Sequence, residues 1–203
     1  MKYYHPFLTV FFLYLLFWTN VQSAELVGKV TVLKKDSLNP LNDFSHSLVY
    51  LTGISTIPET KNVVLNQKNK QFSSRILPIV KGQSVEFWNR DVFKHNIFST
   101  HVNKQFDLGR YPKDQYKTVN FNQLGKYKIY CNIHQKMISD IIVLENHYFS
   151  LTDKMGNYNI KNIPAGKYQL HVWNIYGGEF EQEIIFKAND MLEKQIKIAN
   201  TKI

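Results

Sequence analysis

The sequence contains a single cysteine, Cys131, and this scarcity limits the chemistry that the chain can carry. One cysteine cannot build an internal disulfide framework. It also excludes covalent haem attachment through a Cys-x-x-Cys-His motif, and the His-x-His pairs that a multicopper centre needs are absent. A lone thiol exposed in an oxidising compartment is easily oxidised, so Cys131 is expected to be deeply buried or bound to a metal.

Arginine is scarce as well, with only three residues, whereas lysine is abundant. Lysine and arginine together number 25 against 16 acidic residues, so the whole chain has a formal net charge of +9. The lysines are scattered along the sequence rather than clustered, which argues against nucleic-acid binding. A positive surface of this kind favours acidic partner proteins or an anionic membrane face.

The first 24 residues have the order of a secretory signal peptide. Lys2 supplies a positive charge, Phe7–Trp18 is almost wholly apolar, and the residues that follow are small or polar. The apolar run is shorter than the roughly 20 residues that a membrane-spanning helix needs. We therefore expect residues 1–24 to be a signal peptide cleaved after Ser23 or Ala24, with an uncleaved anchor as the alternative. The mature protein is then expected in the periplasm, without a membrane span.

No amphipathic helix of ordinary length is evident, and the mature chain is typical of an all-β protein. Short runs rich in β-branched and aromatic residues, partly alternating with polar ones, predict strands. Up to residue 144 they lie at Leu26–Leu33, Ser47–Leu51, Ser84–Asn89, Thr118–Phe121, Lys126–Tyr130 and Ile138–Leu144. Many short strands separated by turns predict an antiparallel sandwich. The polar stretch Glu59–Ser74 is predicted to be a loop or an edge insertion.

A second, smaller β module is predicted towards the C-terminus. Asp153–Gly156 and Pro164–Gly166 have turn composition, and apolar residues alternate with polar ones after each of them. Two further strands are expected near the end of the chain. We therefore predict one domain at residues 25–146 and a second at residues 147–203, packed directly behind the first.

Three residue types that bind metals lie together between two predicted strands. Cys131, His134 and Met137 follow a Cys-x2-His-x2-Met pattern, and a short turn between strands can gather their side chains around one point. A trigonal site of two histidines and one cysteine with a weak axial methionine is typical of blue copper. The second histidine must come from elsewhere, and His95, soon after the strand that ends at Asn89, is the candidate. The predicted ligands of one copper ion are therefore His95, Cys131, His134 and Met137.

This segment resembles the cupredoxin, or blue-copper, family. Its ligand spacing is similar to that of amicyanin, and His95–Asn96 resembles the first-histidine motif of plastocyanin. The resemblance, which covers roughly residues 24–146, implies a Greek-key sandwich with a type 1 copper centre. It also implies that Asn96 fixes the ligand loop through hydrogen bonds and that His134, at the solvent edge, passes electrons.

The C-terminal segment resembles carboxypeptidase regulatory-like, or prealbumin-like, β-sandwich modules. The resemblance is carried by Thr152–Gly156 and Pro164–Tyr168. It implies a fold but no activity, because fold does not determine function. The predicted fold class is thus all-β, with a Greek-key cupredoxin sandwich followed by a small prealbumin-like module.

The function implied by these resemblances is that of an exported electron carrier cycling between Cu(I) and Cu(II), with an acidic redox partner. The alternatives are a protein that sequesters or delivers copper and a metal-free scaffold. With all four positions filled by protein ligands no site is open to substrate, so no enzymatic activity is predicted.

The candidate residues also have other interpretations. Cys131 could be a simple core thiol, or part of a nucleophilic pair, although no orienting partner is evident. Zinc could use the same histidines and cysteine, but a thioether ligand favours copper. His101 is interpreted as a loop side chain rather than an outer ligand.

Overall fold

The computed structural model describes residues 23–35, 39–56, 61–102 and 104–201. These residues form sixteen β-strands and no helix, which confirms the all-β prediction. The predicted signal peptide lies outside the described residues except for Ser23 and Ala24. None of the described segments forms a helix long and apolar enough to cross a membrane.

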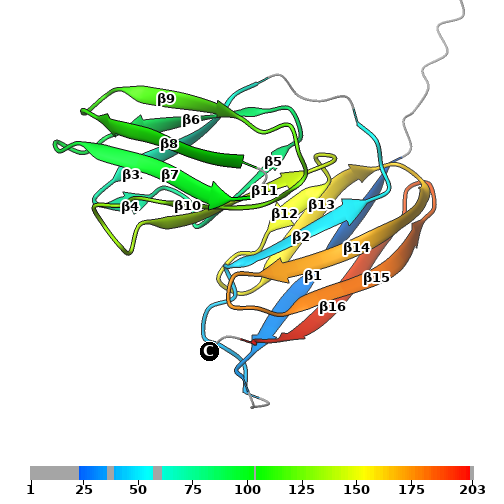
Figure 1. The fold of residues 1–203 in the computed structure, drawn as a ribbon. Coiled ribbons are helices and arrows are strands. Elements are labelled where there is room, and N and C mark those ends of the chain that lie inside the picture. Colours follow the sequence, from blue (N-terminus) through cyan, green and yellow to red (C-terminus); the bar gives the residue numbers. More distant parts are fainter. Residues whose placement is uncertain (1–22, 36–38, 57–60, 103, 202–203) are drawn as a thin grey trace, which may run out of the picture.

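One sandwich is built from a continuous stretch of chain, and we call it the inserted sandwich (Figure 1). Its first sheet has the order β4-β3-β6-β9 and its second the order β5-β11-β10-β7-β8. The strands are β3 (Val63–Lys68), β4 (Gln71–Phe72), β5 (Ile76–Val80), β6 (Ser84–Asn89), β7 (His95–His101), β8 (Lys104–Tyr111), β9 (Tyr116–Asn120), β10 (Gly125–Tyr130) and β11 (Ile138–Leu144). The inward side chains of the two sheets, among them Leu65, Phe87 and Ile97, form one apolar core.

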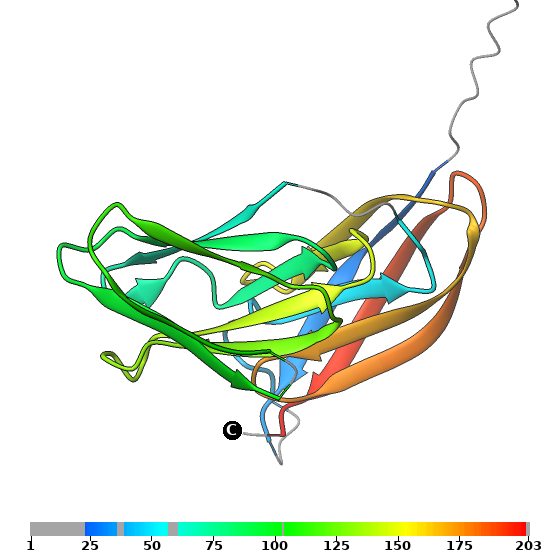
Figure 2. The same cartoon turned by 45° about the horizontal axis from the view of Figure 1, so that its top comes forward.

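The other sandwich draws its strands from both ends of the chain, and we call it the split sandwich. Its sheets have the orders β13-β1-β16 and β12-β2-β14-β15. The strands are β1 (Ala24–Leu33), β2 (Ser47–Thr52), β12 (Phe149–Leu151), β13 (Asn157–Ile163), β14 (Gly166–Asn174), β15 (Glu179–Phe186) and β16 (Met191–Ala199). In Figures 1 and 2 the blue and cyan N-terminal strands lie among the yellow, orange and red C-terminal ones.

This pairing corrects the predicted division into residues 25–146 and 147–203. β1 pairs in parallel with β16 and antiparallel with β13, and β2 lies between β12 and β14. The apolar face of β1, with Leu26, Val30 and Val32, is buried in the core of the split sandwich. The first sandwich is therefore not followed by a second one but inserted between β2 and β12. Alternation along a strand predicts that one face is buried, but it does not identify the strands that cover it.

The prediction that Glu59–Ser74 is a loop or insertion is wrong for most of its described part. The segment contains β3 and β4, which form a hairpin through Asn69 and Lys70, both with positive φ. Half of β3 is polar (VVLNQK), but Leu65 and Gln67 are fully buried, so it contributes an inward face to the core. The sequence analysis did not predict this strand because Gln67 is a polar residue type, although its side chain is buried.

The two sandwiches pack against each other through a third apolar cluster, separate from their two cores. Leu48 and Ile175 of the split sandwich pack with Ile76, Ile142 and Leu144 of the inserted one. An ion pair at the same junction joins Lys126, at the start of β10, to Glu179 at 2.6 Å. β10 rises about 3.3 Å per residue, so the backbone of Cys131, just beyond its far end, lies about 17 Å from that of Lys126. The candidate ligand loop is thus at the end of the inserted sandwich that faces away from the split sandwich.

Candidate metal centre

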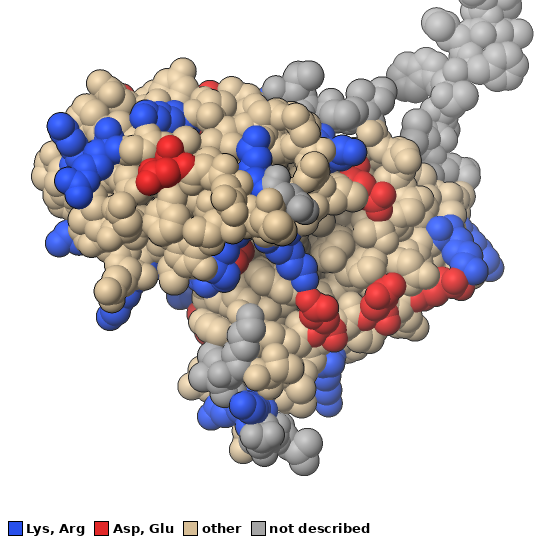
Figure 3. Space-filling view, viewed as in Figure 1, with Lys and Arg blue, Asp and Glu red and all other residues tan. Residues whose placement is uncertain are grey.

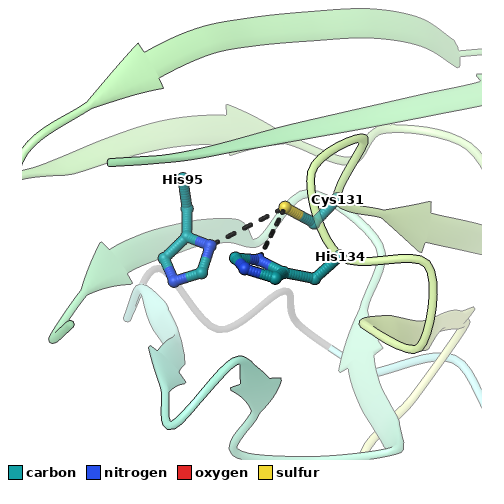
Figure 4. A group of neighbouring side chains, drawn as sticks. All are labelled: His95, Cys131 and His134. Atoms are coloured by element: carbon teal, nitrogen blue, oxygen red, sulfur yellow. Dashed lines mark hydrogen bonds between the residues drawn. The ribbon is translucent and has the colours of Figure 1, made fainter. Parts of the chain in front are cut away.

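The structure brings His95, Cys131 and His134 together at one end of the inserted sandwich (Figure 4). His95 begins β7, Cys131 follows β10, and His134 lies in the loop between β10 and β11. One ligand atom from each residue lies within 4.8 Å of the other two. His95 and Cys131 are buried, at 0% and 4% exposure, and His134 is partly exposed. Residues 36 positions apart in sequence thus form one cluster of nitrogen and sulfur donors.

The distances within the cluster fit a shared metal ion. Cys131 Sγ lies 3.7 Å from His95 Nδ1 and 3.9 Å from His134 Nδ1. Typical metal–nitrogen and metal–sulfur bonds in proteins, taken from zinc sites, are about 2.0–2.1 Å and 2.3 Å. At a bond angle of about 120°, these lengths place nitrogen and sulfur about 3.8 Å apart. The two sulfur–nitrogen separations are therefore those that a trigonal ion requires, and the two histidine nitrogens lie within 4.8 Å of each other.

Asp91 fixes which nitrogen of His95 faces the cluster. Its carboxylate accepts a hydrogen bond from His95 Nε2 at 2.8 Å. A neutral imidazole that donates through Nε2 keeps its lone pair on Nδ1, the atom that faces Cys131. A carboxylate bound to the second nitrogen of a metal-ligating histidine also raises the basicity of that ligand. His95 is thus held in the tautomer that a metal ion needs.

The Asp91 carboxylate is itself anchored by the β3–β4 hairpin. The backbone N–H groups of Asn69 and Lys70 donate to its two oxygens at 2.7 and 3.0 Å. Burial opposes the ionisation of Asp91, but the hydrogen bonds from Lys70, His95 and Asn69 outweigh it and lower the pKa of the carboxyl group. Asp91 is therefore a fixed anion behind His95. The sequence analysis did not predict Asp91 as a partner of His95, because the two residues are joined by an irregular loop in which no regular spacing indicates a contact.

Two backbone hydrogen bonds close the loop that carries the other candidate ligands. Cys131 N donates to Met137 O at 3.3 Å, and Met137 N donates to His134 O at 2.9 Å. Asn96 Oδ1 accepts a hydrogen bond from Asn132 N at 3.2 Å, which confirms the expectation that Asn96 fixes this loop. The side chain of Met137 is 1% exposed, at the end of the same loop. Its role as the fourth ligand stays a prediction.

Phe93 covers the two histidine rings on the outer side of the cluster. Its ring centroid lies 5.1 Å from that of His95 and 5.6 Å from that of His134. Burial is the main cause that lowers the pKa of His134; electrostatic interactions with His95 and Lys70 add to it, and Asp91 opposes it. His134 is therefore biased towards the neutral form that can bind a metal.

His101 does not join the cluster. It ends β7, and its ring packs against Tyr127 at 4.5 Å between centroids. Among the described histidine, cysteine, aspartate and glutamate residues, only His95, Cys131 and His134 form a group of three suited to a metal ion. His101 is thus outside the cluster, but it is a partly buried residue at the end of a strand rather than the predicted loop side chain.

Comparisons with known proteins give structural likeness only. No family model and no curated protein matches the chain. A copper-containing nitrite reductase from Thermus scotoductus SA-01 is 25% identical over 47% of this chain, with a TM-score of 0.40. A purple cupredoxin from Nitrosopumilus maritimus is 23% identical over 41% of this chain and 100% of its own length, with a TM-score of 0.38. A mutant amicyanin in its Cu(I) form is 19% identical over 47% of this chain and 98% of its own, with a TM-score of 0.39. The match to the nitrite reductase spans a quarter of that enzyme's length.

Proposed function

We propose that this protein is an exported type 1 copper protein that carries single electrons in the periplasm. His95, Cys131, His134 and Met137 hold one copper ion in this proposal. The observation that carries it is the pair of distances from Cys131 Sγ to the two imidazole Nδ1 atoms, 3.7 and 3.9 Å. Two histidines, one thiolate and a thioether are the donor set that selects copper over harder ions.

The surroundings of the donors suit a site that must keep its shape in two oxidation states. A bound copper ion would supply one-electron cycling, with the electron entering from a reduced partner protein and leaving to an oxidised one. Asp91 holds the ring of His95, and Asn96 together with the backbone of Met137 holds the loop of Cys131. Because the donors are preorganised, little rearrangement should accompany electron transfer.

The exposure of the donors supports a route for the electron. His95 and Cys131 are buried, whereas His134 is partly exposed. A partner protein can approach the ring of His134 without opening the site. With four protein donors no coordination position is left for substrate, and an electron carrier is favoured over an enzyme.

The first test is the visible spectrum of the mature protein after loading with Cu(II). We expect an intense thiolate-to-copper band that is lost in Cys131→Ala and is altered or lost in His134→Ala. His101→Ala is the matched control, because it removes a histidine outside the cluster, and its band should be unchanged. A colourless protein, or a band that persists in Cys131→Ala, would overturn the type 1 assignment.

Voltammetry separates electron transfer from copper handling. A reversible one-electron wave, with copper that a chelator removes slowly, is the result expected of an electron carrier. Rapid loss of copper to the chelator without a reversible wave would instead identify a protein that stores or delivers copper. Retention of zinc in preference to copper would contradict both functions.

A further inference from the structure

Two adjoining hollows open beside the candidate metal centre, with volumes of about 430 and 630 Å³. The smaller is lined by the β3–β4 turn and by the loop between β6 and β7, including Lys70, Asp91 and Phe93. The larger extends from it towards Lys113. Lys68 and Arg90 line both, and we call the two adjacent hollows together the cationic hollow.

The charge of the cationic hollow is positive. Four cations line it: Lys68, Lys70, Arg90 and Lys113. The two acidic residues in its lining already have partners, because Asp91 binds His95 and Asp114 pairs with Arg90 at 3.0 Å. Figure 3 shows Lys and Arg side chains gathered at the free end of the inserted sandwich, whereas acidic side chains form a row on the split sandwich.

Arg90 is held in place before any ligand arrives. Its guanidinium lies over the ring of Trp88, 4.2 Å from the centroid, and Trp88 in turn stacks on Tyr116 at 4.3 Å. Its Nη1 donates to Asp114 and its Nε to Asn66 at 3.4 Å. A guanidinium that is already oriented loses less conformational entropy when it binds a carboxylate than a free side chain would.

The cationic hollow is physically connected to the candidate metal centre. The Asp91 carboxylate lines it and holds His95. Lys70 Nζ lies 5.5 Å from the centroid of the Phe93 ring, and that ring touches both histidines. An anionic group bound here would therefore lie next to the ring system through which an electron is proposed to pass.

Apolar side chains at the rim indicate what kind of ligand fits. Val92 is 83% exposed and Phe93 is 37% exposed, and both line the hollow. Arginine and aromatic residues are enriched in protein interfaces, where exposed apolar side chains become covered. A small inorganic anion would pair with the cations but leave these two side chains in water. A protein segment that carries both carboxylates and apolar side chains satisfies both features.

We propose that the cationic hollow is the docking site for an aspartate- or glutamate-rich segment of the redox partner. The identity of the partner as a redox protein rests on the proposed function, whereas binding of an acidic segment does not. In the docked state partner carboxylates pair with Arg90 and the lysines, while Val92 and Phe93 are covered. Docking thus places the partner beside His95 and His134.

The test measures binding of poly-L-glutamate to the copper-free mature protein by calorimetry. In Lys68→Glu/Lys113→Glu both positions are exposed, so the variant should fold normally, and binding should weaken about tenfold if each reversed charge costs about 0.7 kcal/mol. Lys187→Glu/Lys197→Glu makes the same change in charge at exposed positions of the split sandwich and should bind within about twofold of the unmodified protein. Histidine-ring NMR signals of His95 and His134 should shift on titration, and that of His171 should not.

Equal weakening in both variants would overturn the proposal, because binding would then follow net charge alone. It would also be overturned if poly-L-glutamate did not bind, or if inorganic phosphate or single-stranded DNA competed as well as the peptide. Since copper is absent from the assay, a colourless protein that still binds the peptide at this surface would reject the redox function and leave the docking site standing.

Discussion

The two sandwiches differ in how far apart in sequence their strand partners lie. In the inserted sandwich neighbouring strands are often consecutive, as β10 and β11 are. In the split sandwich Glu25 pairs with Met191, so almost the whole chain lies between partners. Closing such a long loop costs conformational entropy before any contact is made. The strand partners of the inserted sandwich all lie between residues 63 and 144, so its loops are shorter to close, whereas the split sandwich closes around it.

The chemistry is as unevenly divided as the topology. The cluster of His95, Cys131 and His134 lies wholly in the inserted sandwich, at the end that faces away from the split one. The split sandwich contributes no residue to it, and its described residues contain no comparable group. The comparison indicates that the split sandwich supports and presents the inserted one, while the inserted one carries the proposed function.

The largest expected effect on stability, and a test of whether the two sandwiches act independently, comes from a matched pair of core truncations. Leu65 and Leu170 are both fully buried, one in each core. Leu65→Ala and Leu170→Ala should each lower the free energy of unfolding by about 2–5 kcal/mol, because each leaves a cavity. Only Leu65→Ala should also speed the loss of copper to a chelator. Equal loss of copper in the two variants would show that the sandwiches act as one unit.

Two glycines should distinguish backbone strain from steric conflict in the split sandwich. Gly156 and Gly53 have nearly the same φ, +88° and +89°. A Cβ at Gly156 would lie 2.2 Å from the carbonyl oxygen of Val30, whereas one at Gly53 would come no nearer than 3.9 Å, to Tyr168. Urea unfolding should show a loss of about 3 kcal/mol for Gly156→Ala and about 1 kcal/mol for Gly53→Ala. Similar losses in both variants would mean that the positive φ alone, and not the conflict with Val30, sets the loss of stability.

Replacing an aspartate that accepts backbone hydrogen bonds should lower copper affinity in the inserted sandwich but not in the split one. Asp91 accepts from Asn69, Lys70 and His95, and Asp153 accepts from Met155 and Asn157 in the split sandwich. Asp91→Asn should weaken copper binding about 10- to 100-fold, roughly 1.4–2.7 kcal/mol, because it removes the carboxylate behind His95. Asp153→Asn should leave affinity unchanged. Competition with a Cu(I) chelator measures both, and unchanged affinity in Asp91→Asn would remove Asp91 from the site.

The smallest expected effect is a pH dependence at the junction. Burial lowers the pKa of His46, and the charge of Arg75 adds to this while Asp43 opposes it. Above the usual value of about 6.5 the ring is neutral in both states. As the pH falls below that value the unfolded chain takes up a proton first, so stability is lost until the folded pKa is reached. His46→Gln should flatten the fall in unfolding free energy between about pH 7.5 and 5.5 by less than about 1 kcal/mol. An identical pH profile in the variant would contradict this assignment.

Local patterns in the sequence were reliable wherever the physical cause was itself local. Alternation predicted most strands of the split sandwich, because every second side chain of a half-buried strand is apolar, but in the inserted sandwich it predicted only β6, β9, β10 and β11. The spacing of Cys131, His134 and Met137 predicted that one loop would gather them, and the structure brings Cys131 and His134 to His95. The partnership of Asp91 with His95 could not be read in the same way, since it depends on where the β3–β4 turn presents its amide groups.

What the sequence by itself determined was the all-β class and the donor types that could meet near Cys131. Tertiary structure alone decided that β1 and β2 belong with the C-terminal strands. The reason is that the apolar face of β1 can be buried against any complementary sheet, and only β13 and β16 complete its hydrogen bonds. The tertiary fold alone also placed a fixed carboxylate behind His95 and four cations beside it, because these residues lie in turns and at a strand end whose neighbours are set by sheet packing rather than by spacing.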